Sequence, residues 1–137
     1  MCWKGRVLMI QQFIELGQGY GDIYELSELI KTNEHRFHHA FIFVSSKNDQ
    51  QYCSLAVAFK PVGESKFMPI YICREGIPYS EEKKSKRIEI FENVVKNIQK
   101  IPIQITIKHS SEFANEKMFY QHLIGILRMN HYIPPMS

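Results

Sequence analysis

The chain has 137 residues, of which 45% are hydrophobic and 23% are charged. This length suits one domain, and this composition excludes disorder as the dominant state. The formal net charge of +3 is too small for a protein whose function is dominated by phosphate contacts, which argues against a nucleic-acid partner. No run of residues approaches the roughly 18 consecutive apolar residues of a membrane span. We therefore expect a cytoplasmic protein without a membrane partner.

The N-terminal pattern indicates where the domain begins, and the cysteine pattern indicates the redox compartment of the protein. The first strand-like pattern begins near Met9, so we expect residues 1–8 to be an upstream extension or a disordered arm, and 9–137 to be the domain. Cys2, Cys53 and Cys73 are widely spaced and form no CxxC pair. This pattern predicts reduced thiols in a reducing compartment, rather than a disulfide or a metal site.

The first half of the chain predicts a strand over 8–16 and, after a glycine-rich turn, a helix over 22–33 that begins with a capping-box pattern at Asp22 and Glu25. Three strands follow, over residues 37–46, 51–60 and 66–74. The first of these has a continuous apolar centre, which is typical of a strand buried on both faces. Pro69 lacks the N–H that a sheet ladder needs, so we expect its strand to lie at an edge or to carry a bulge.

The second half predicts a long helix over 81–99, a strand that starts at Ile101, and a final helix over 114–129. Isoleucines alternate with polar residues along this strand, so one of its faces is expected to be buried. The last helix is apolar over a wide arc, and it is either buried or offers a surface to a partner. The whole pattern predicts a single α+β domain, in which a mixed five-stranded sheet packs with three helices in the order strand, helix, three strands, helix, strand, helix.

A glycine-rich turn provides the first candidate site. Gly17, Gly19 and Gly21 lie between a predicted strand and a predicted helix, where backbone amides can cradle a phosphate. The GxGxG spacing is neither the dinucleotide fingerprint nor a Walker A loop, and Asp22 would itself occupy the donors, so a tight turn is the alternative. Together with Arg74 at the end of a predicted strand, these glycines form a candidate site for a phosphorylated ligand.

A group of histidines provides the second candidate. His35, His38 and His39 follow the first predicted helix, and imidazoles at this density can bind zinc or nickel. Neighbouring residues of a regular strand point to opposite faces, so His38 and His39 would not face one metal ion. We therefore expect these histidines to be polar residues at the start of the predicted strand, and we expect neither a metal nor another cofactor.

Two further patterns resemble known sites. Asp49 followed by Glu64-Ser65-Lys66 is similar to the active-site spacing of restriction-type nucleases, and the order of elements from residue 22 onward resembles the core of that fold. The two acids flank one strand and would lie roughly 30 Å apart, so we expect a nuclease-like core without the nuclease active site.

A basic run, Lys83, Lys84, Lys86 and Arg87, is expected to be a solvated face or a surface for an acidic partner.

Three stretches carry a resemblance to a family. MIQQFIELGQGYGDIYELSELIKTN (9–33), FMPIYICREGIP (67–78) and YQHLIGILRMNHYIPP (120–135) resemble short uncharacterised proteins of spore-forming Firmicutes. Some members are loosely labelled methylthioribose kinase, but this chain has no kinase-type lysine, no HxD loop and no metal-binding aspartate after it. The resemblance therefore implies a bacterial cytoplasmic setting and no mechanism.

The leading hypothesis from the sequence is a non-catalytic binding or interaction module that forms a homo-oligomer or binds a protein partner. The first alternative is a small enzyme or a phosphorylated-ligand-binding protein that uses the turn over 17–21. The second alternative is a weak nucleic-acid binder that uses the basic run.

Overall fold

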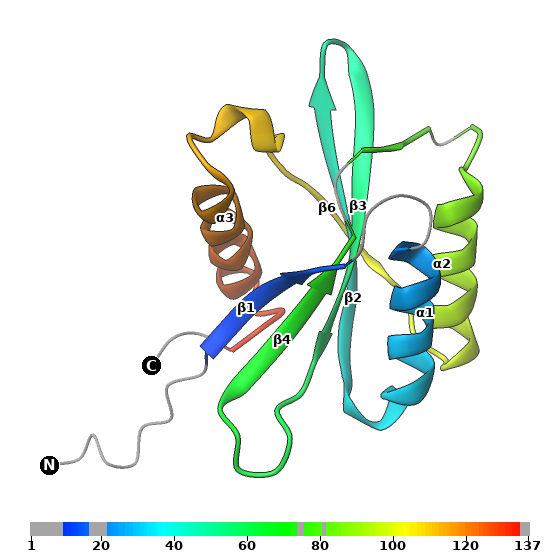
Figure 1. Cartoon of the computed structure of the whole chain (residues 1–137). Coiled ribbons are helices and arrows are strands. Elements are labelled where there is room, and N and C mark those ends of the chain that lie inside the picture. The colour runs from blue at the N-terminus through cyan, green and yellow to red at the C-terminus, as the bar shows by residue number, and fades with distance from the viewer. Residues whose placement is uncertain (1–9, 17–21, 74–75, 81, 135–137) are drawn as a thin grey trace, which may run out of the picture.

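The computed structural model describes residues 10–16, 22–73, 76–80 and 82–134, which form a mixed six-stranded sheet and three α-helices (Figure 1). The elements are β1 (Ile10–Glu15), α1 (Asp22–Thr32), β2 (Phe37–Lys47), β3 (Gln50–Phe59), β4 (Phe67–Ile72), β5 (Ile77–Pro78), α2 (Lys86–Asn97), β6 (Ile103–Thr106) and α3 (Glu116–Met129). Two 3-10 turns, η3 (Glu34–Arg36) and η4 (Ser110–Glu112), precede β2 and α3. The predicted α+β class and the predicted mixed sheet with three helices are confirmed, and β5 adds a strand of two residues.

The sheet has the strand order β1-β4-β3-β2-β6, and β5 pairs with β3. β1 is parallel to β4 and β2 is parallel to β6, whereas β3 is antiparallel to β2, β4 and β5. β3 therefore runs opposite to the other described strands. A two-residue turn joins β2 to β3, and its residues Asn48 and Asp49 both have positive φ angles, as a type I′ hairpin requires.

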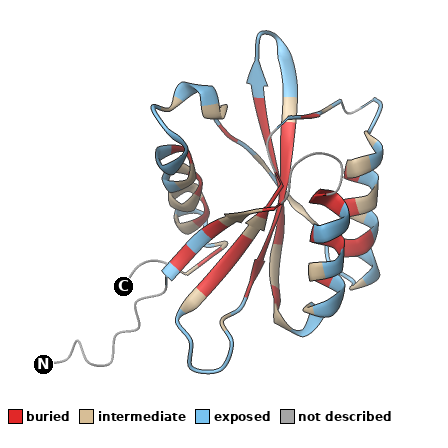
Figure 2. Cartoon of the chain, in the orientation of Figure 1, coloured by how far each residue is buried: buried red, intermediate tan, exposed pale blue. Residues whose placement is uncertain are grey.

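Helices cover both faces of the sheet, with α1 and α2 on one face and α3 on the other (Figure 1). The central strands supply apolar side chains to both cores, as the alternation along β2 shows. Ala40 and Ile42 pack under α1 and α2, whereas Phe41 and Phe43 face α3. Figure 2 shows these buried strands between helices whose outer faces are exposed. The predicted burial of this strand on both faces is confirmed.

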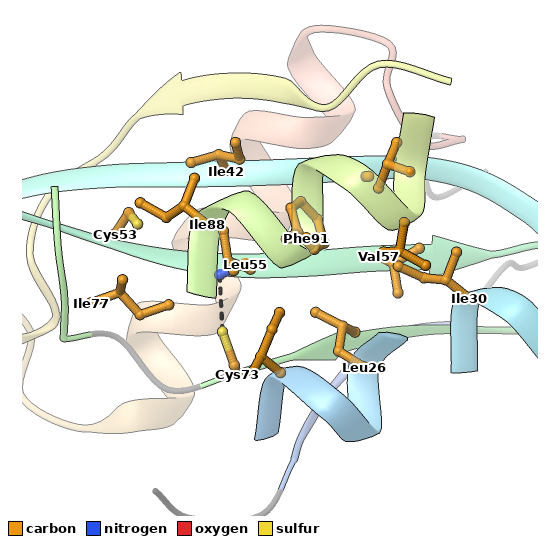
Figure 3. Close-up of a cluster of buried hydrophobic side chains, with 14 of the residues drawn as sticks. Leu26, Ile30, Ile42, Cys53, Leu55, Val57, Cys73, Ile77, Ile88 and Phe91 are labelled. Atoms are coloured by element: carbon orange, nitrogen blue, oxygen red, sulfur yellow. Dashed lines mark hydrogen bonds between the residues drawn. The ribbon is translucent and has the colours of Figure 1, made fainter. Parts of the chain in front are cut away.

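Both described cysteines are buried free thiols in the core beneath α1 and α2. The Sγ atom of Cys73 accepts a hydrogen bond from the backbone N–H of Leu55 at 3.2 Å (Figure 3). Burial raises the pKa of both thiols to about 12, so they remain neutral at physiological pH. As the sequence predicts, Cys53 and Cys73 serve as small apolar core residues.

Pro69 lies in an interior strand, and the prediction of an edge strand or a bulge there is wrong. β4 sits between β1 and β3, and Pro69 pairs in register with Gln12 of β1. The ladder between β3 and β4 covers only Ile70–Ile72 of β4, so it begins one residue after the proline. The missing N–H therefore removes no bond to β3.

The second helix begins later than the sequence pattern indicates. Ser85 is in extended conformation and its hydroxyl accepts a hydrogen bond from the backbone N–H of Ile88 at 3.3 Å, so α2 starts at Lys86. Arg87 in its first turn forms a bidentate ion pair with the nearly fully buried Asp22 of α1, at N···O distances of 2.7 and 2.8 Å. This pair joins the starts of the two helices.

The last helix is buried along one side only. Phe119, Leu123 and Leu127 are buried, whereas the side chains of Met118 and Met129 are 47% and 80% exposed.

Within the part of the chain that the structure describes, no helix has the length and apolar character needed to cross a bilayer.

Candidate functional site

A pocket of about 390 Å³ lies between the sheet and the segment that leads into α3. We call it the α3 pocket. The sheet contributes Glu15, Ser54 and Ile72, and the η4–α3 segment contributes the rings of Phe113, Phe119 and Tyr120. Its volume is within the range of roughly 300–1,000 Å³ that is usual for small-molecule sites.

The strand topology explains where the α3 pocket lies. Glu15 and Ile72 are the last residues of β1 and β4, and they are partners in the parallel register of these strands. The carboxyl ends of parallel strands are the places where open α/β sheets usually bind ligands. The α3 pocket therefore lies at the carboxyl ends of the parallel strands β1 and β4.

β3 contributes Ser54 to the described lining of the α3 pocket. The residues of β3 on the α3 face include Tyr52, Ser54, Ala56 and Ala58, because successive side chains of a strand point to opposite faces. The opposite face of the same strand carries Leu55 and Val57.

Ser54 is the most informative residue of the α3 pocket. Its side chain is buried, with 1% of the residue exposed, and its Oγ atom has no hydrogen-bond partner among the described residues. A buried polar group without a partner costs about 1–3 kcal/mol of folding free energy. Ser54 is also one of the residues that line the α3 pocket, so a ligand in the pocket would lie beside this residue.

Aromatic rings and a polar rim complete the α3 pocket. The ring of Phe119 lies 5.7 Å from that of Phe113 and 5.3 Å from that of Tyr120, and Tyr120 in turn stacks on Phe13 at 4.9 Å. Ser110, Asn115 and Glu116 form the rim. The Oδ1 atom of Asn115 accepts a hydrogen bond from the backbone N–H of Met118 at 2.9 Å. This bond caps the start of α3, which borders the pocket.

The glycine-rich candidate site falls outside the described residues: Gly17, Gly19, Gly21 and Arg74 all belong to segments that the structure does not describe. The described residues directly before these segments, Leu16 and Cys73, follow the neighbouring strands β1 and β4. The backbone N–H of Leu16 donates to the carbonyl of Ile72 at 2.9 Å. The described residues Leu16 and Ile72 therefore lie side by side at this end of the sheet.

The histidine candidates are arranged differently from the prediction. His35 is exposed in η3, but a β-bulge between Phe37 and His39 inserts His38 as an extra residue. The strand is therefore not regular here, and the rings of His38 and His39 lie only 4.4 Å apart, which corrects the expectation that they point away from each other.

The environment of this histidine pair favours the neutral form of both rings. The Nε2 atom of His38 lies 2.9 Å from the carbonyl oxygen of Tyr132, which places this nitrogen against the C-terminal segment. Burial lowers the pKa of both His38 and His39 below 6.5. In the described part of the chain, no group of three or more His, Cys, Asp or Glu side chains is placed to hold a metal ion.

The remaining candidates are dispersed. Asp49 and Glu64 lie in the connections at opposite ends of β3, so they do not approach each other. In the basic run, Lys84 pairs with Glu92 at 3.0 Å and Arg87 pairs with Asp22. These two cations are therefore engaged within the domain.

Ser54, Glu15, Phe113, Phe119 and Tyr120 are site residues that motif analysis missed. No motif contains them, since they come from four separate segments.

Comparison with known proteins places these residues within one family. The model of one family, Domain of unknown function (DUF7147), matches residues 9–133. The chain belongs to this family. The match includes every described residue of the α3 pocket, from Glu15 to Tyr120. No curated protein and no solved structure matches the chain.

Proposed function

We propose that this DUF7147 chain is a non-catalytic binding module whose α3 pocket takes a small polar ligand, in a bacterial cytoplasmic setting. The observation that carries the proposal is the Ser54 hydroxyl, which is buried in the pocket wall and has no hydrogen-bond partner among the described residues. Such a group costs folding free energy, and a ligand in the pocket would supply its missing partner.

The position of the pocket supports the same proposal. Its lining combines apolar rings with a few polar groups, which is the usual composition of a small-molecule site. Rigid elements hold these groups, since Glu15, Ser54 and Ile72 belong to paired strands and Phe119 and Tyr120 to α3. A ligand in this place would meet a preformed surface.

A fragment screen by NMR on the full chain tests the proposal. We expect fragments with a hydroxyl or amino group to shift the backbone amide signals of Ser54, Ile72, Phe119 and Tyr120 together. The Ser54→Ala variant is expected to bind these fragments about fivefold to tenfold more weakly, which corresponds to one lost hydrogen bond.

Ser27→Ala is the matched control. Ser27 is also buried and its Oγ atom also lacks a partner among the described residues, but it lies on α1, on the opposite side of the sheet. This variant should bind the fragments as the unmodified chain does. Fragments that shift only signals remote from the α3 pocket, or that bind Ser54→Ala at full strength, would refute the proposed function.

A further inference from the structure

The packing of α1 against α2 leaves a groove on the face of the sheet opposite to α3. The ion pair between Asp22 and Arg87 joins the starts of the two helices, which run side by side in the same direction (Figure 1). A hollow of about 320 Å³ lies between the middles of the helices, with Ser27 of α1 and Val94 of α2 among its lining residues. We call this hollow the α1–α2 groove.

Two further hollows continue the α1–α2 groove along the helices. One, of about 540 Å³ beside the helix starts, shares Tyr24 and Ile90 with it, and another, of about 460 Å³ beside the helix ends, shares Lys31. The three hollows therefore follow one another along α1 and α2. A long depression of this kind fits a ligand that is itself extended better than it fits a compact small molecule.

The charges of the α1–α2 groove favour an uncharged ligand. Among its described lining residues, only Glu28 and Lys31 are charged, and they form an ion pair at 3.7 Å on the exposed side of α1. The two charges cancel within the lining. A neutral polar ligand therefore matches this lining better than an anion or a cation does.

Two carboxamides of α2 supply neutral polar groups to the α1–α2 groove. Asn93 and Asn97 both line it and both are exposed, and their spacing of four residues places them on one side of the helix. Along the helix axis the two positions lie about 6 Å apart, and alternate residues of an extended chain lie about 6.6 Å apart. A carboxamide carries a donor and an acceptor, as a peptide group does. Every second residue of an extended peptide presents its N–H and C=O groups to the same side, so the spacing of the two asparagines matches them.

The rest of the lining suits the side chains of such a peptide. Tyr24 of α1 is 58% exposed, and the partly buried Ile90 of α2 adds apolar surface. Ser27 also lines the groove, with 6% of the residue exposed, and its Oγ atom has no hydrogen-bond partner among the described residues. A bound peptide would therefore lie beside apolar side chains and beside a hydroxyl group that the described part of the chain leaves unpaired.

We propose that the α1–α2 groove binds an extended, uncharged peptide segment of a partner protein. The carboxamides of Asn93 and Asn97 pair with the N–H and C=O groups of two alternate residues of the peptide, and an apolar side chain of the peptide packs on Tyr24 and Ile90. The groove and the α3 pocket lie on opposite faces of the sheet, so this inference does not rest on the proposed function.

Selection from a phage-displayed library of random linear seven-residue peptides on the immobilised full chain provides the probes. The selected peptides are synthesised with both ends blocked, and their binding is measured by calorimetry and NMR. We expect uncharged peptides that shift the backbone amide signals of Tyr24, Ile90 and Asn97 together. If no selected peptide shifts these signals, the proposal is overturned.

An ester scan of the tightest peptide tests the extended register. Each backbone N–H of the peptide is replaced in turn by an ester oxygen, which removes one donor and leaves the side chains unchanged. We expect two positions separated by one residue to weaken binding about fivefold to tenfold each, as for one lost hydrogen bond, and the position between them to weaken it less than about twofold. Any other pattern overturns the pairing with Asn93 and Asn97.

The Asn97→Ala variant assigns these losses to the groove. It is expected to weaken the peptide about fivefold, and one of the two sensitive ester positions should have no further effect in this variant, because the partner of that N–H is gone. Alanine is a better helix former than asparagine, so this replacement of an exposed residue should not disturb folding. Gln121→Ala, which removes an exposed carboxamide from α3, is the matched control and should leave binding unchanged.

The outcomes separate this inference from the proposed function. Ser54→Ala should leave peptide binding unchanged, because Ser54 lines the α3 pocket on the other face of the sheet. Equal binding of the peptide by Asn97→Ala and Gln121→Ala would overturn the peptide site, while the proposed function would still stand on the fragment screen.

Discussion

At the scale of single residues, Ser54 is where stability and binding are expected to conflict. The next two residues on the same face of β3, Ala56 and Ala58, are alanines, so an alanine at position 54 would continue their pattern. The hydroxyl lacks a partner among the described residues, and its burial removes it from water. In the absence of a ligand, it therefore contributes a cost to folding.

We predict that Ser54→Ala raises the free energy of unfolding by about 1 kcal/mol, because it removes a buried polar group that has no hydrogen bond to the described residues. Urea denaturation of the ligand-free chain measures this value. Ser27→Ala, for the same reason, should also stabilise the chain. A loss of more than about 1 kcal/mol in Ser54→Ala would show that the hydroxyl makes a structural hydrogen bond, and would contradict this account of the pocket.

The sequence predicts the burial of a residue correctly where the pattern of its own strand decides that burial. Cys53 and Cys73 lie in apolar strand-like runs, and they are core thiols in the structure. Ser54 follows Cys53 directly but was missed. The hydrogen-bond partners of a side chain come from other elements, and no pattern along the chain reports them.

At the scale of elements, the start of β2 shows how one extra residue changes the surroundings of its neighbours. The bulge at His38 brings two imidazoles side by side, and the C-terminal segment covers them through the carbonyl of Tyr132. Two lysines add positive charge, since Lys60 acts on His38 and Lys100 on His39. Protonation of both rings is therefore unfavourable in the folded chain.

We predict that the chain loses stability as the pH falls below about 6.5. Burial, the largest cause, lowers the pKa of His38 and His39 in the folded state, so the unfolded chain binds more protons just below 6.5. Stability therefore rises with pH in this range and falls as acid is added. Urea denaturation midpoints at about pH 7.5 and about pH 5.5 measure the effect.

A neutral replacement assigns the acid sensitivity to this pair. His39→Gln cannot take up a proton, so its midpoint should fall less between the two pH values than that of the unmodified chain. His35→Gln changes an exposed histidine of η3 and should keep the full dependence. Equal dependence in the unmodified chain and in His39→Gln would place the acid sensitivity elsewhere, for example at His122, whose pKa is also lowered by burial.

At the scale of the whole molecule, the C-terminal segment ties the first strand to the last helix. The side chain of Gln11 donates to the carbonyl of Pro134 at 2.7 Å and accepts from the Nε atom of Arg128 at 2.6 Å. Ile133 is 1% exposed and belongs to the core beneath α3. The segment that follows α3 is therefore part of the packed domain.

We predict that Ile133→Ala lowers the free energy of unfolding by about 3 kcal/mol, because it leaves a cavity in the core beneath α3. Urea denaturation of the full chain measures the loss. Met129→Ala is the control, since this side chain is 80% exposed, and it should change stability by no more than about 0.5 kcal/mol. Equal effects of the two substitutions would mean that the segment after α3 does not pack on the sheet.

The sequence by itself determined the class of the fold, the order of its elements and most of its buried faces. These follow from local periodicity and composition, as in the continuous apolar centre of β2 and the alternating isoleucines of β6, which each strand or helix carries independently of its partners. Only the tertiary structure decided that β4 lies between β1 and β3, that the rings of His38 and His39 meet, and that Ser54 faces a pocket beside Glu15 and Tyr120. These features depend on which segments become neighbours in space, and that choice is set by packing across the sheet rather than by any single stretch of the chain.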